Sequence, residues 1–120
     1  MKTALIVEDS QTDQNFFSSH LQKAGFSVTA VSTVEEAETK VKANKPDLII
    51  LDVILPGQSG FELCRELKSQ DETKNIPIII CSTKETNVDK MWGDMLGANA
   101  YLVKPVDPDE FVNTAKKFAN

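Results

Sequence analysis

Short, continuous apolar runs recur along the chain, and the stretches between them place apolar residues at helical spacing. Runs that lack apolar/polar alternation are typical of strands buried on both faces, as in a parallel sheet covered by helices. The pattern therefore predicts five strands. Three are strongly indicated, at residues 4–7, 48–51 and 78–81, and two more weakly, at residues 28–31 and 100–103.

Helices are predicted in the gaps between these strands, and several begin with a capping signal. Ser10 and Asp13 have the spacing of a capping box, with Asp in place of the usual Glu, and Thr33 and Glu36 repeat that spacing. Asp107 precedes a proline at the first position of the last helix. The expected buried faces are Phe17, Leu21 and Ala24; Val34, Ala37 and Val41; Phe61, Cys64 and Leu67; Val88, Met91, Trp92, Met95 and Leu96; and Phe111, Ala115 and Phe118.

The alternation of strands and helices predicts a (βα)₅ unit of the α/β class. Right-handed crossovers then give a doubly wound, five-stranded parallel sheet. We expect one domain over residues 1–120, with no effector domain. The stripe around Met91 is interpreted as core rather than as a cofactor site.

Composition narrows the function classes. The net charge of −5 and the absence of a basic block argue against binding to nucleic acid. The first apolar run, residues 4–7, is too short for a signal peptide or a membrane span, so we expect a cytoplasmic protein without membrane insertion. Cys64 and Cys81 match no metal-ligand spacing and are expected to be buried free thiols.

Polar side chains follow four of the five predicted strands. In an open parallel sheet, ligands bind outside the carboxyl ends of the strands, so these side chains should converge on one edge. Clustered carboxylates repel one another unless a cation is present, and oxygen ligands suit Mg²⁺. The converging residues are Glu8 and Asp9, then Asp52, then Ser82 and Thr83, and finally Lys104.

This set suits phosphoryl chemistry. A carboxylate beside Mg²⁺ can attack a phosphoryl group and form an aspartyl phosphate. Lys104 would neutralise the added charge, and the Ser82 hydroxyl would donate to a phosphoryl oxygen. The alternative is that the carboxylates are solvated caps of the following helices. The convergence of several polar groups on one edge favours the phosphoryl site.

Four segments carry a resemblance to a known family. The sequence resembles the receiver domain of two-component response regulators, especially stand-alone receivers of the CheY type. The resemblance covers essentially the whole chain and implies the strand order 2-1-3-4-5. The matching segments are residues 6–10 (IVEDS), 47–60 (DLIILDVILPGQSG), 76–83 (IPIIICST) and 98–105 (ANAYLVKP).

The resemblance implies a phosphorylation site and a metal site. Asp52 matches the phospho-accepting aspartate and Lys104 the lysine that contacts the phosphoryl group. Asp9 matches the direct Mg²⁺ ligand, with Glu8 supporting the metal through water. Asp52 and the backbone carbonyl of Ile54 would complete the protein ligands.

The resemblance also implies a switch. Ser82 matches the switch hydroxyl, Tyr101 matches the aromatic side chain that changes rotamer, and the Lys104–Pro105 bond matches a cis peptide. Pro56 and Gly60 match the loop after the phosphorylation site, where Gly60 would permit a tight start to the helix.

Four positions need separate comment. Glu8 replaces the commoner Asp, which preserves the charge but lengthens the reach. The resemblance implies that Ile54 and Lys84, two residues beyond Asp52 and Ser82, flank the path of an attacking water. These positions vary in the family and tune the phosphoryl lifetime, so that lifetime stays open. His20 is interpreted as a helix-face residue rather than as a phosphorelay histidine.

The resemblance implies a signalling protein that catalyses only its own phosphorylation and dephosphorylation, rather than an enzyme with a separate substrate. Its partners would be a histidine kinase or histidine-phosphotransfer protein and an unknown downstream protein, reached through the fourth helix, fifth strand and last helix. The pathway is left open between motility or chemotaxis, relay through a second phosphotransfer protein, and feedback on the kinase.

Other function classes are weighed against this one. A haloacid-dehalogenase-like phosphatase would need a second Asp where Ile54 stands. Flavodoxin-like binding would need a phosphate loop after the first strand. A pseudo-receiver that takes no phosphate is the remaining alternative.

Overall fold

The computed structural model describes residues 1–83 and 87–119, and only the backbone of residues 87, 88, 92 and 93. Lys84 and the side chains of Val88 and Trp92 therefore lie outside the described part. The strands are β1 (Thr3–Val7), β2 (Ser27–Val31), β3 (Leu48–Leu51), β4 (Ile78–Ser82) and β5 (Ala100–Val103). The helices are α1 (Gln11–Lys23), α2 (Val34–Ala43), α3 (Gly60–Ser69), α4 (Asn87–Met95) and α5 (Pro108–Phe118).

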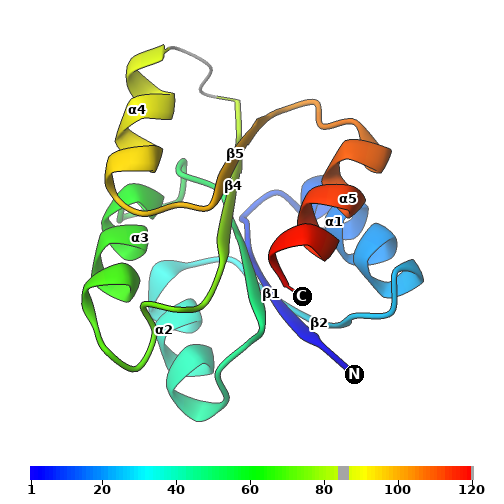
Figure 1. Ribbon diagram of the computed structural model, residues 1–120, viewed down its shortest axis with the longest axis horizontal. Coiled ribbons are helices and arrows are strands. Elements are labelled where there is room, and N and C mark those ends of the chain that lie inside the picture. Colours follow the sequence, from blue (N-terminus) through cyan, green and yellow to red (C-terminus); the bar gives the residue numbers. More distant parts are fainter. Residues whose placement is uncertain (84–86, 120) are drawn as a thin grey trace.

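The strands form one parallel sheet in the order β2-β1-β3-β4-β5, which confirms the predicted fold class and strand order. Helices α1 and α5 cover one face of the sheet, and α2, α3 and α4 cover the other (Figure 1). Each face has its own apolar core, because side chains of a strand alternate between the two faces. Among the described residues, no helix combines the length and apolar character that crossing a bilayer requires.

The continuous apolar runs are strands, as predicted, because helices on both faces remove every residue of the run from water. All four residues of β3 are buried, and β3 and β5 have the bounds expected from the sequence. The other three strands differ from expectation by one residue at one end. Cys64 and Cys81 are buried free thiols, as expected.

The predicted core stripe of α4 is wrong in part. Met91 and Met95 are 61% and 77% exposed, whereas Leu96 packs against the core. Met95 is the last residue of α4 and Leu96 follows it, so the apolar spacing in the sequence runs past the end of the helix. Met91 and Met95 are four residues apart and share one face of α4, and that face is turned to water.

The start of α1 differs from a full capping box. The Ser10 hydroxyl accepts from the Asp13 backbone N–H at 3.3 Å, as predicted. The Ser10 backbone N–H donates to the Glu8 carboxylate at 3.1 Å rather than to Asp13. The Asp13 carboxylate instead pairs with Lys104, because a full charge is a stronger partner than an amide. This contact joins α1 to the end of β5.

Candidate functional site

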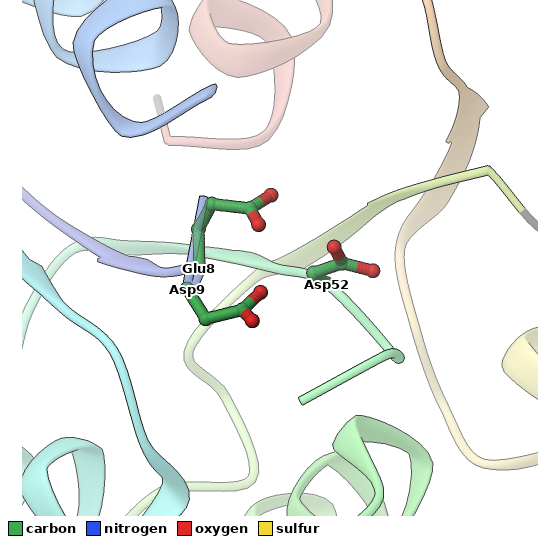
Figure 2. Close-up of side chains that lie close together, drawn as sticks. All are labelled: Glu8, Asp9 and Asp52. Carbon is green, nitrogen blue, oxygen red and sulfur yellow. The ribbon is translucent and has the colours of Figure 1, made fainter. Parts of the chain in front are cut away.

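Three carboxylates meet at the carboxyl ends of β1 and β3. Glu8 and Asp9 follow β1, and Asp52 follows the adjacent strand β3. Each offers an oxygen that lies within 4.8 Å of the others' (Figure 2). Glu8 and Asp52 are buried and Asp9 is exposed, so the cluster is open to solvent on one side. An oxygen-only donor set with room for water fits Mg²⁺, and a divalent cation would offset the repulsion among the three charges.

Lys104 lies against this cluster. Its ammonium donates to Glu8 at 2.5 Å, to Asp13 at 2.8 Å and to Asp52 at 3.0 Å. Only 11% of the Lys104 side chain is exposed. The ion pairs are therefore poorly screened by solvent. The structure thus brings together Asp52 and Lys104, which the sequence predicted on one edge of the sheet.

Both carboxylate oxygens of Asp52 have partners. One accepts from the backbone N–H of Ile54 at 3.0 Å, and the other accepts from Lys104. The Gly60 backbone N–H donates to the Val53 carbonyl at 3.1 Å, which ties the start of α3 to the residue after Asp52. The Asp52 side chain is thereby held between the Ile54 backbone N–H and the Lys104 ammonium.

Burial is the largest single influence on the pKa values of Glu8 and Lys104. Burial and the nearby charge of Asp52 raise the pKa of Glu8 to about 7, although Lys104 and the Ser10 N–H act to lower it. Burial alone would lower the pKa of Lys104, but its bonds to Asp13, Glu8 and Asp52 outweigh that effect and raise its pKa. Lys104 is thus held in its charged form beside Asp52.

Ser82 lies on β4 and Tyr101 on β5, which are on the side of β3 away from β1. Ser82 is fully buried at the end of β4, and its carbonyl accepts from the Lys104 backbone N–H at 2.9 Å. Leu51 pairs with Ile80, so the register places Ser82 one residue beyond the level of Asp52. Burial raises the pKa of the half-buried Tyr101, and a side-chain hydrogen bond with Ser82 acts to lower it. Ser82 is therefore linked to Tyr101 on β5 and to Lys104, which follows β5.

The structure also describes three further features that the sequence singled out. The Lys104–Pro105 peptide bond is cis, as the resemblance implied. Gly60 is needed for a reason other than a left-handed conformation, because its Cα packs directly on the Asp52 backbone. His20 lies on α1 with its ring 4.6 Å from the ring of Phe16, as expected for a helix-face residue.

The sequence did not predict two residues of α1 that contact the candidate site. The capping pattern explains Asp13 as part of a helix cap, and no nearby residue indicates its contact with Lys104, 91 residues away. The Gln14 side-chain amide donates to the Glu8 carbonyl and, at 3.3 Å, to the Val31 carbonyl, which fixes the chain after β1 against β2. No sequence motif indicates that contact.

Comparison with known proteins identifies the family. Residues 4–116 match the response regulator receiver domain, and the chain belongs to that family. Protein PilH of Pseudomonas aeruginosa is 37% identical over 114 residues, which cover 95% of this chain and 94% of PilH. The phosphate regulon transcriptional regulatory protein PhoB of the same species is 38% identical over 115 residues, 96% of this chain but only 50% of PhoB.

A solved structure agrees with this result. The chemotaxis response regulator CheY4 of Vibrio cholerae superposes with a TM-score of 0.91 at 32% identity, over 98% of each chain. The chain is therefore a receiver domain of two-component signalling. Receiver domains are signalling modules that bind Mg²⁺ and interact with histidine kinases or phosphotransfer proteins, and the acidic cluster is where this chain could hold the metal.

Proposed function

We propose that this receiver takes a phosphoryl group onto Asp52 from the phosphohistidine of a histidine kinase or histidine-phosphotransfer protein. The observation that carries the proposal is the position of the Asp52 carboxylate. It lies at the end of the central strand, 3.0 Å from the Lys104 ammonium and within the acidic cluster. Of the three clustered carboxylates, Asp52 is the one that follows β3, which pairs with the strand that ends in Ser82.

The transfer is a single displacement at phosphorus. An Asp52 carboxylate oxygen attacks the phosphorus, the P–N bond of the donor breaks, and the imidazole nitrogen keeps the electron pair and takes a proton. Lys104 donates to an oxygen of the transferred group and offsets its charge. The Ile54 N–H holds the other Asp52 oxygen, so the attacking oxygen is oriented before the donor arrives.

The metal site consists of Glu8, Asp9, Asp52 and the backbone carbonyl of Ile54. Mg²⁺ bound there would neutralise charge on the phosphoryl oxygens. The exposed Asp9 would be the direct ligand, and the buried Glu8 would support the metal through water. Gln14 holds the Glu8 backbone in place from α1.

Phosphorylation would change partner binding through the surface formed by α4, β5 and α5. The new phosphoryl oxygens draw the Ser82 hydroxyl toward Asp52, and Tyr101 follows because its side chain is hydrogen-bonded to Ser82. On α4 this surface carries Met91 and Met95, whose flexible side chains suit an adaptable protein contact. The downstream partner is a protein, and the two forms are populations of one equilibrium.

The test is labelling with acetyl phosphate and Mg²⁺, followed by the intact mass. Wild type should gain one acid-stable, base-labile phosphoryl group, and Asp52→Asn should not label at the wild-type rate. Asp47→Asn is the matched control, since Asp47 precedes β3, is exposed and binds the Thr3 backbone N–H at 2.8 Å. Labelling of Asp52→Asn as fast as Asp47→Asn would contradict the proposal and favour a pseudo-receiver or another acceptor.

A further inference from the structure

The Lys104 ammonium has all its hydrogen-bonding capacity in use. An ammonium carries three N–H donors, and three carboxylates accept from it: Glu8, Asp13 and Asp52. The Lys104 side chain is 11% exposed, and its ammonium lies 6.0 Å from the centre of the Phe17 ring. The ammonium is therefore held by three carboxylates and is largely shielded from water.

The three partners are not equivalent. Glu8 and Asp52 belong to the acidic cluster that would hold a cation, whereas Asp13 comes from the first turn of α1 and lies outside that cluster. The Asp13 backbone is fixed by its bond to the Ser10 hydroxyl, and its carboxylate takes no part in capping. Among the three, Asp13 is the partner that a cation at the cluster does not recruit.

We propose that Asp13 is a positioning residue that keeps the Lys104 ammonium at the phosphoryl site when a cation and a phosphoryl group engage Glu8 and Asp52. This inference rests on the proposed function and deepens it. A cation that engages Glu8 and Asp52 before the phosphoryl group arrives would remove two of the three acceptors of Lys104. Because a lysine has more rotamer freedom to lose on ordering than most side chains, an ammonium left without acceptors at that stage would move away from the site. The Asp13 carboxylate, 2.8 Å from the ammonium, would keep it in place until the phosphoryl oxygens accept from it.

The negative charge of Asp13 also opposes an incoming anion. Positioning of Lys104 by Asp13 favours phosphoryl binding, whereas repulsion by Asp13 opposes it. The exposure of each group to water decides which effect is larger. Asp13 is 36% exposed, so water screens its charge toward the phosphoryl group. Its contact with Lys104 is direct at 2.8 Å, and the lysine is largely buried. The positioning effect therefore exceeds the repulsion.

The test compares Asp13→Ala with Asp13→Asn. The amide retains an acceptor oxygen without the charge, and alanine removes both. The first measurement is beryllofluoride binding at fixed Mg²⁺, followed by NMR shifts. The second is NMR relaxation of the Lys104 ε-methylene, which reports how well ordered the lysine side chain is. We expect Asp13→Ala to weaken beryllofluoride binding about tenfold, or about 1.4 kcal/mol. Asp13→Asn should stay within roughly threefold of wild type, because it still offers Lys104 an acceptor.

Asp109→Ala is the matched control, because Asp109 is an exposed first-turn acid of α5 and should leave both readouts unchanged. Asp13→Ala should also lower the order of the Lys104 ε-methylene in the protein without Mg²⁺. Beryllofluoride binding by Asp13→Ala equal to or tighter than wild type would overturn the inference. If wild type itself binds no beryllofluoride, the proposed function fails. In that case the inference is tested by the order of the Lys104 ε-methylene alone. If this order is the same in Asp13→Ala as in wild type, the inference is overturned.

Discussion

Gly60 packs directly on the backbone of Asp52: a Cβ atom at Gly60 would lie 2.2 Å from the Asp52 carbonyl oxygen and 2.7 Å from the Cα atom of Val53. Both neighbours are backbone atoms, so the clash cannot be relieved by a side-chain rotation. The first residue of α3 thus sets the position of the chain that carries the proposed phospho-accepting carboxylate.

Gly60→Ala should therefore displace Asp52 and lower the unfolding free energy by about 1–3 kcal/mol, as overpacking does. Gly57→Ala is the control, because Gly57 has a φ of 84° and open space around it. That variant should lose roughly 1–2 kcal/mol through backbone strain while leaving Asp52 in place. Urea unfolding gives the free energies, and the amide shift of Ile54 reports on Asp52. The same Ile54 shift in both variants would contradict the close-packing account.

Asp9 is expected to be the exposed protein ligand of Mg²⁺. Asp9→Ala should weaken Mg²⁺ binding at least about tenfold, because one of three carboxylates is removed from a site that also keeps several waters. A Mg²⁺ titration followed by the amide shifts of residues 8–10 and 52–54 measures this, with Asp47→Asn as the control. A variant lacking Asp9 that still responds like wild type would show that the metal lies elsewhere.

Ser82 is expected to couple the phosphoryl group to β5. With beryllofluoride and Mg²⁺, wild type should show shifts at Tyr101 and along α5, and Ser82→Ala should lose them because the responding hydroxyl is gone. Thr83→Ala removes the adjacent, exposed hydroxyl and should keep the shifts. If Ser82→Ala retains them, the proposed coupling does not exist.

Cys64 links stability to alkaline pH. Burial raises the pKa of the Cys64 thiol from 9.0 to about 11, while nearby Lys68 acts to lower it. A pKa raised on folding stabilises the protein below the unfolded pKa, and this contribution is lost as the pH rises from about 9 through about 11. Between about pH 8.5 and about pH 10.5, wild type should lose about 1–2 kcal/mol more unfolding free energy than Cys64→Ala. Equal losses in the two proteins would contradict this account.

The apolar pattern predicted the strands well because burial on both faces leaves a direct trace in the sequence. Residues 48–51 are a strand with the predicted bounds for that reason, and all four are buried. Residues 100–103 also have the predicted bounds, although β5 is an edge strand whose residues are only partly buried. The same pattern was wrong for Met91 and Met95, because spacing alone does not show which face of a helix is turned toward the sheet.

Some residues of the candidate site could be predicted from the sequence, and others could not. The strand-end positions of Glu8, Asp9 and Asp52 follow from the parallel topology, which brings carboxyl ends of strands to one edge. The partner of Asp13 did not follow, because its contact with Lys104 depends on how α1 docks against the end of β5. The local capping pattern accounts for the Asp13 backbone and leaves no signal for its carboxylate.

The central claim is that Asp52 itself receives the phosphoryl group from a phosphohistidine. The direct measurement is transfer from a phosphorylated histidine-phosphotransfer protein, followed by borohydride reduction of the acyl phosphate and peptide mass spectrometry. Borohydride converts a phosphorylated aspartate to homoserine, so the acceptor is marked at its own position. The account predicts homoserine at position 52, dependent on Mg²⁺ and on the donor. Homoserine at position 9 or at another aspartate, with position 52 unmodified, would contradict it.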